Sequence, residues 1–216
     1  MSYQTSPSPL SPPDRPLDYW LSPELAAITP ANARSRLREL AGARGAYMGA
    51  WAAGIGVGAV LVLLGVILSV RLGTLVTLPA LGLPGAALGA LCGIFFVRVR
   101  NRLPRTSRAL VNRGPGSLRG ALSFVAFVLL VLMGLFAFTA KPSTWQDPDA
   151  LLTLALVLAF MVSLLVVGII VPATIMGHSR ESLRCKAAAD PRFRALLEQD
   201  LATWRDPYGN AGYGPL

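Results

Sequence analysis

The sequence predicts an all-α integral membrane protein with four transmembrane helices and with both ends of the chain on the cytoplasmic side. Three observations support this prediction. Of the 216 residues, 53% are hydrophobic and only 14% are charged, whereas a soluble domain usually has about 25% charged residues. The apolar residues gather in four blocks that contain no Asp, Glu, Lys or Arg. The basic residues are distributed very unevenly between and around these blocks.

Each of the four blocks is long enough to cross a bilayer as a helix. A transmembrane helix needs about 20 apolar residues, and the shortest block, between Arg119 and Lys141, has 21 residues. A buried helix of a soluble protein needs only about 10–14 such residues, so we set that alternative aside. Within a transmembrane domain of residues 45–177, we expect the spans at about residues 46–70, 77–98, 120–140 and 151–176.

The placement of the basic residues predicts the orientation of the spans. Five precede the first span, seven lie between spans two and three, and six follow span four, which leaves only Arg71 and Lys141 in the two short hairpin loops. Basic residues stay on the cytoplasmic side during insertion. We therefore expect both tails and the middle loop to be cytoplasmic, and we expect the membrane to be a bacterial inner membrane.

Two segments precede the first span. Residues 1–21 are rich in Ser, Pro and Asp, which predicts a flexible arm. Residues 22–44 predict two short cytoplasmic or interfacial helices, because a capping residue followed by proline occurs twice in this segment. The second helix is expected at about residues 30–42, where its arginines suit anionic lipid headgroups.

Small residues recur along spans one and two at intervals typical of close helix packing. Residues four apart share one face of a helix, and Gly or Ala at such positions lets two backbones approach closely. We therefore predict a tight helix–helix interface, within the chain or with a partner, although Gly and Ala are also abundant in membrane helices in general. The residues of this prediction are Gly49, Ala50, Gly54, Gly58, Gly85, Gly89 and Gly93.

Spans three and four have a different composition from the first two. They consist mostly of Leu, Val and Phe with few small residues, so we expect bulky apolar surfaces that face lipid. Pro172 lies near the inner end of span four. Because proline removes a backbone donor, a kink is expected there.

Residues 178–216 predict a cytoplasmic tail that contains one amphipathic helix. Asp190 followed by Pro191 is typical of a helix N-terminus, and we place the helix at about residues 191–205. So short a helix is marginal in water alone, and its apolar face needs cover from membrane or protein. The residues of that face are Phe193, Leu196, Leu197, Leu201 and Trp204.

The middle loop is the strongest candidate for a docking surface. Residues 98–119 hold seven arginines and no acidic residue, and arginine pairs bidentately with phosphate and carboxylate groups. Near an anionic leaflet each basic residue contributes about 1 kcal/mol of attraction. These arginines either dock anionic lipid or an acidic partner, or they only set the topology. The docking candidates are Arg98, Arg100, Arg102, Arg105, Arg108 and Arg113.

Residues suited to catalysis, ion transport or metal binding are scarce. Transporters normally place charged groups at membrane depth, and the apolar blocks have none, while the chain has a single histidine, His178. We predict no catalytic residue, no metal site, no cofactor and no nucleic-acid partner.

The leading hypothesis is therefore a non-catalytic accessory or scaffold subunit of a multi-subunit membrane complex. Its expected partners are the lipid bilayer and other membrane-protein subunits. Two alternatives remain open. One is a component of an oligomeric channel or transporter, and the other is a membrane enzyme that acts on lipid-linked phosphate substrates.

Overall fold

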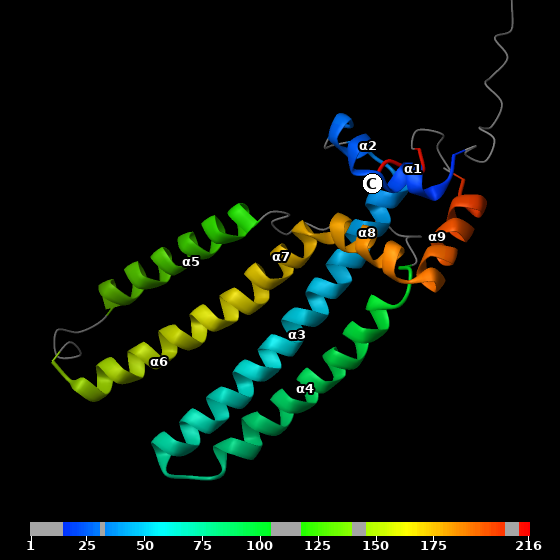
Figure 1. Ribbon diagram of the computed structural model, residues 1–216. Coiled ribbons are helices and arrows are strands. Elements are labelled where there is room, and N and C mark those ends of the chain that lie inside the picture. The colour runs from blue at the N-terminus through cyan, green and yellow to red at the C-terminus, as the bar shows by residue number, and fades with distance from the viewer. Residues whose placement is uncertain (1–14, 31–32, 105–117, 140–145, 206–211) are drawn as a thin grey trace, which may run out of the picture. The chain divides into compact units, whose positions relative to one another are not determined.

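The computed structural model describes residues 15–30, 33–104, 118–139, 146–205 and 212–216 (Figure 1). These residues form helices and contain no strand. The helices are α1 (Leu17–Leu21), α2 (Pro23–Ile28), α3 (Arg36–Leu72), α4 (Thr77–Arg100), α5 (Leu118–Thr139), α6 (Pro148–Leu165), the π-helical turn η2 (Val166–Ile170), α7 (Val171–Gly177), α8 (Ser179–Ala189) and α9 (Pro191–Thr203).

Four helical stretches have the length and composition to cross a membrane. They are Arg36–Leu72, Thr77–Arg100, Leu118–Phe138 and Pro148–Gly177. This finding confirms the prediction of an all-α chain with four helices apolar enough to lie in a lipid bilayer. The chain divides into two compact units, which are described separately below. The membrane unit comprises Gly45–Arg100 and Asn112–Gly177, and the terminal unit comprises Met1–Arg44, Asn101–Val111 and His178–Leu216.

In the membrane unit, α3 and α4 form an antiparallel hairpin (Figure 1). Gly73 follows the end of α3 with a φ of 61°, a left-handed conformation that glycine adopts without the clash a Cβ would cause. The chain then reverses, and α4 begins at Thr77. The hydroxyl oxygens of Ser69 and Thr77 lie 2.8 Å apart and share a hydrogen bond across the turn.

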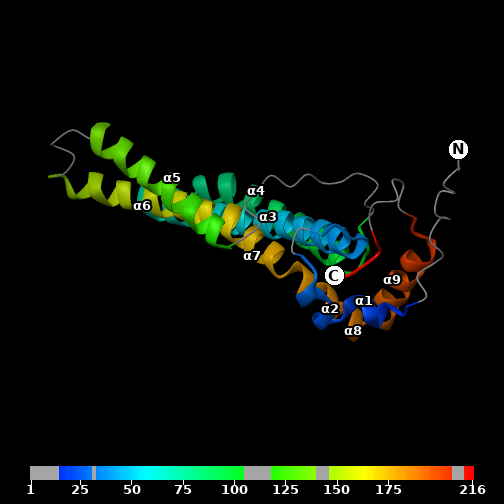
Figure 2. The ribbon, with the colours of Figure 1, turned by 90° about the horizontal axis from the view of Figure 1, so that it is seen from above.

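The fourth span is one continuous helical stretch made of α6, η2 and α7. Where the sequence predicts a kink at Pro172, the structure has the π-helical turn Val166–Ile170 just before it. Proline has no N–H to donate to the carbonyl four residues earlier, and a wider turn is one way for a helix to absorb such a defect. The third span, α5, contacts η2 and α7 and lies beside α6 in both views (Figure 1; Figure 2).

The terminal unit has a hydrophobic core of its own. The core is formed by residues from α1, the first turns of α3, α8, α9 and the last residues of the chain. Its buried members are Leu17, Leu37, Leu40, Ala41, Leu183, Ala187, Phe193, Leu197, Tyr213 and Leu216. Trp20, Leu21, Leu103, Leu201 and Trp204 pack against it.

The last residues of the chain complete the N-terminus of α3. The first N–H groups of a helix have no partner within the helix. Here the N–H of Arg36 donates to the Gly212 carbonyl at 3.1 Å, and the N–H of Leu37 donates to the Tyr213 carbonyl at 3.0 Å. The Ser35 hydroxyl donates to the Pro215 carbonyl at 2.6 Å and accepts from the third N–H of the helix at 3.3 Å.

The residues before the first span therefore differ from the sequence-based expectation. A separate helix at about residues 30–42 is absent from the described residues, because α3 begins at Arg36 and continues without a break to Leu72. Part of the segment expected as a flexible arm is helical, since α1 covers Leu17–Leu21, whereas residues 1–14 lie outside the described residues.

Candidate functional site

The first feature of the membrane unit is the contact between α3 and α4, where glycines allow the two backbones to lie close together. A Cβ placed on Gly58 would come within 2.5 Å of the Gly85 carbonyl oxygen and within 2.8 Å of the Gly89 backbone nitrogen. A Cβ on Gly54 would overlap the side chain of Cys92. Two helices approach this closely only where side chains are absent.

A second face of α3 packs against the fourth span. A Cβ on Gly49 would lie 3.1 Å from the Cα of Pro172, and a Cβ on Gly56 would overlap the side chain of Val167. Both partners lie at or next to the π-helical turn. The part of α3 from Gly49 to Gly58 is thus held between α4 on one side and η2 with α7 on the other.

Not all predicted packing residues lie at these contacts. Ala50 is exposed on α3, and a Cβ on Gly93 would have no neighbour within 4 Å among the atoms described. On α4, Ala86 and Ala90 are also exposed. Residues 86, 90 and 93 follow one another at helical spacing. We call Ala86, Ala90 and Gly93 the open row of α4.

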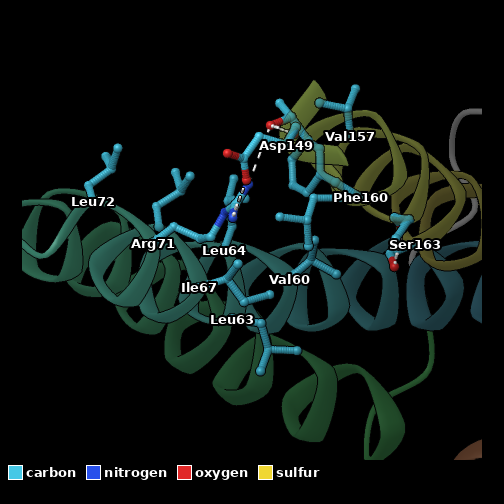
Figure 3. A pocket seen from close by; sticks show the side chains of 14 residues that line it. Val60, Leu63, Leu64, Ile67, Arg71, Leu72, Asp149, Val157, Phe160 and Ser163 are labelled. Atoms are coloured by element: carbon cyan, nitrogen blue, oxygen red, sulfur yellow. Dashed lines mark hydrogen bonds and ion pairs between the residues drawn. The ribbon is translucent and has the colours of Figure 1, made fainter. Parts of the chain in front are cut away.

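The second feature is a groove between the C-terminal part of α3 and α6, with a volume of about 710 Å³. Its walls are mostly apolar. Val60, Leu64 and Ile67 line it from α3, while Leu156 and Phe160 line it from α6 (Figure 3). Ligand sites commonly have volumes of about 300–1,000 Å³, so the groove has the size of a ligand site. Two of the lining residues are well exposed, Leu63 of α3 at 60% and Val157 of α6 at 49%. The groove is therefore open to its surroundings.

One end of the groove carries a pair of opposite charges. Arg71 of α3 faces Asp149 of α6 (Figure 3), with 3.9 Å between guanidinium nitrogen and carboxylate oxygen. The Arg71 side chain also donates to the Thr153 hydroxyl at 3.5 Å. These distances are long for an ion pair and a hydrogen bond. The Arg71 side chain is 35% exposed and the Asp149 side chain is 90% exposed. Both groups therefore retain capacity to bind a polar ligand.

The other polar groups of the groove are already bonded within the helix. The Thr153 hydroxyl donates to the Asp149 carbonyl at 2.8 Å, and the Ser163 hydroxyl donates to the Ala159 carbonyl at 2.7 Å. Away from Arg71 and Asp149, the groove thus offers a ligand little beyond apolar contact. The described residues hold no group of three or more His, Cys, Asp or Glu side chains arranged for a metal ion.

The structure shows part of the predicted arginine surface. Arg98 and Arg100 lie on the last turn of α4 and Arg102 follows its end, and all three are exposed. Arg105, Arg108 and Arg113 lie outside the described residues.

The amphipathic helix of the tail is α9, and the chain itself covers its apolar face. Phe193 and Leu197 are 2% and 0% exposed in the core of the terminal unit, and Leu201 and Trp204 pack against that core. Leu196 differs from the others, because it is 41% exposed. The chain itself therefore supplies most of the cover that this face needs.

Ion pairs and a cap fix α9 in the terminal unit. The Asp190 carboxylate accepts from the N–H groups of Arg192 and Phe193 at 3.1 and 3.3 Å and pairs with Lys186 at 2.8 Å. The hydrogen bond from Lys186 and the two cap N–H groups lower the pKa of the Asp190 carboxyl. Arg36 pairs with Asp200 at 3.0 Å.

From the sequence Arg71 is expected only as a loop residue, and the groove is not predicted. A signal was present, since one basic residue ends span one and an acidic residue precedes span four. Two long helices, α4 and α5, lie between these positions in the chain, so the second position returns to the end of the fold where the first lies. Comparison of the chain with known protein families, characterised proteins and solved structures finds no match.

Proposed function

We propose that the chain is a non-catalytic accessory or scaffold subunit of a larger membrane assembly, with both tails in the cytoplasm. The observation that carries this proposal is the open row of α4. One row of small residues on α4, Gly85 and Gly89, faces α3 of the same chain. In the open row Ala86 and Ala90 are exposed, and a Cβ on Gly93 would meet no described atom within 4 Å.

Small residues on a lipid-facing surface favour contact with another helix over contact with lipid. Packing of two backbones, rather than the hydrophobic effect, drives helix association inside a bilayer. A surface of Ala86, Ala90 and Gly93 presents the backbone of α4 without bulky side chains in front of it. We infer that a transmembrane helix of a partner subunit packs there.

The basic segment at the end of α4 supports the same proposal. Arg98, Arg100 and Arg102 are exposed, and their guanidinium groups suit anionic headgroups or acidic side chains of a partner. In the proposed topology these arginines face the cytoplasm, where positive charge is retained during insertion.

The experiment is purification of the tagged full chain from native membranes in a mild detergent, followed by measurement of the intact particle mass and identification of its members. The expected result is a stoichiometric particle that contains other membrane proteins. Recovery as a monomer or as a pure homo-oligomer would contradict the proposal and would favour the channel or enzyme alternatives.

A matched pair of substitutions tests the surface itself. Ala86→Leu places a bulky side chain in the open row, whereas Ala87→Leu makes the same change at an exposed neighbour about 100° away around the helix. We expect Ala86→Leu to release the partner and Ala87→Leu to retain it. Equal retention by both variants would show that the open row is not the interface.

A further inference from the structure

The groove between α3 and α6 combines an apolar wall with a polar end at the membrane surface. Its lining on α3 runs from Val60 to Leu72, a helical length of roughly 18 Å. One leaflet of a hydrocarbon core of about 30 Å is roughly 15 Å thick. The groove thus extends from the end of the span to about the bilayer midplane, which is the reach of one acyl chain.

The charges at the open end select among lipid headgroups. A phosphate attracts the Arg71 guanidinium, which has five N–H donors in a planar arrangement that matches phosphate oxygens. The Asp149 carboxylate lies 3.9 Å from Arg71 and is 90% exposed, so it repels a purely anionic headgroup. A headgroup that carries both a phosphate and an ammonium group complements the two side chains together.

We propose that the groove binds a zwitterionic aminophospholipid of the phosphatidylethanolamine class. One acyl chain lies along Leu64, Ile67 and Phe160, the phosphate pairs with Arg71, and the primary ammonium group pairs with Asp149. The proposal goes beyond the subunit role and does not depend on it, because the lipid would bind whether or not a partner occupies α4.

Charge also argues against a helix as the occupant. A hydrophobic partner helix would leave Arg71 with only the Asp149 carboxylate and the Thr153 hydroxyl, both at distances longer than a good ion pair or hydrogen bond. It would gain little from an end of the groove that keeps a nearly fully exposed carboxylate. A zwitterionic headgroup instead supplies an opposite charge to each group.

The test measures which lipid the full chain retains. The protein is reconstituted in vesicles of equimolar phosphatidylethanolamine, phosphatidylcholine and phosphatidylglycerol with identical acyl chains, then extracted in mild detergent and analysed by native mass spectrometry. Since an exposed ion pair changes affinity by up to about fivefold, we expect phosphatidylethanolamine to be enriched by roughly threefold to fivefold over each of the other two lipids.

Three variants separate the parts of the site. Asp149→Asn should remove the preference over phosphatidylglycerol, and Arg71→Gln should lower the retention of all three lipids. Ala159→Phe fills the groove at one of its lining residues and should abolish retention. As the control, Arg192→Gln removes an exposed basic residue of the terminal unit and should leave the wild-type pattern. Circular dichroism and thermal unfolding identify any variant that has lost its fold.

Several outcomes would overturn the proposal. They are a bound-lipid ratio equal to that of the vesicles, enrichment of phosphatidylglycerol instead, or an Asp149→Asn variant that folds and keeps the wild-type preference. A stoichiometric polypeptide bound in place of lipid, released by Ala159→Phe, would show that the groove receives a partner helix.

Discussion

Replacing Gly58 with alanine should loosen the hairpin of α3 and α4, because a Cβ at this position meets backbone atoms. The nearest are the Gly85 carbonyl oxygen at 2.5 Å, the Gly89 nitrogen at 2.8 Å and the Gly89 Cα at 2.9 Å. Backbone of a helix cannot turn aside as the end of a flexible side chain does. The helices must therefore separate by about 1 Å before the contacts reach ordinary van der Waals distances.

The expected magnitude follows from two opposing terms. Overpacking of this kind costs about 1–3 kcal/mol, and the gap opened along the rest of the interface weakens its other contacts. Alanine in place of glycine recovers about 0.5–1 kcal/mol of helix propensity. We expect a net loss of roughly 1–2 kcal/mol, which corresponds to a fall in the unfolding temperature of about 2–8 °C.

Gly93→Ala is the matched control, since it makes the same chemical change in α4 where no atom lies within 4 Å of the new Cβ. It should be neutral or slightly stabilising. Thermal unfolding of the purified chain in detergent, followed by circular dichroism, compares the two variants. If Gly58→Ala melts at the wild-type temperature, or if both variants lose the same stability, the argument from close backbone contact is refuted.

Three further predictions concern the terminal unit. Ser35→Ala removes the hydroxyl that donates to the Pro215 carbonyl and caps α3. The loss should lower the stability of the terminal unit by about 1 kcal/mol and speed its proteolysis. An unchanged cleavage rate would contradict this prediction. Burial raises the pKa of Tyr213 well above its usual range, so the stability that the neutral phenol contributes should decline as the pH rises above about 10, and Tyr213→Phe should remove that alkaline decline in unfolding measurements. The hydrogen bond with Lys186 is the main cause that lowers the pKa of the Asp190 carboxyl. The contribution of the ionised carboxylate to stability should therefore be present above the ordinary aspartate pKa and lost as the pH falls through the lower folded value. Asp190→Asn should flatten that acid dependence between about pH 5 and pH 2 in circular dichroism, and an acid transition identical to wild type would count against the cap.

The spans were predictable because each block free of charged side chains must lie in an apolar environment. The ends of the helices were less predictable. The sequence places the start of the first span near residue 46, whereas α3 begins at Arg36. Hydropathy reports where lipid begins, but a helix continues into a polar environment as long as its backbone groups are bonded. The first bonds of α3 come from Gly212 and Tyr213, and no local pattern reveals so distant a partner.

The candidate site shows a similar division. The spacing of Gly54 and Gly58 indicates a face suited to close packing, and in the structure this face lies against α4. The same spacing does not say which of two rows on α4 is covered, since Gly85 and Ala86 are neighbours in sequence and differ only in the direction they face. The groove depends on how far α3 and α6 diverge, which follows from the packing of two segments about 90 residues apart in the chain.

The bonds between the start of α3 and the last residues of the chain also set an order of events during synthesis. Ser35 and Pro215 are 180 residues apart, which a ribosome covers in roughly 10–40 s. Until α8 and α9 have been made, Leu37 and Leu40 lack most of the neighbours that bury them in the finished protein, although the first span has already been translated. The newborn chain therefore passes through a stage in which its membrane helices are synthesised while apolar residues of the terminal unit are still uncovered. A chain that stopped a few residues early would lack Tyr213 and Leu216 from this core and would leave the first N–H groups of α3 without their partners.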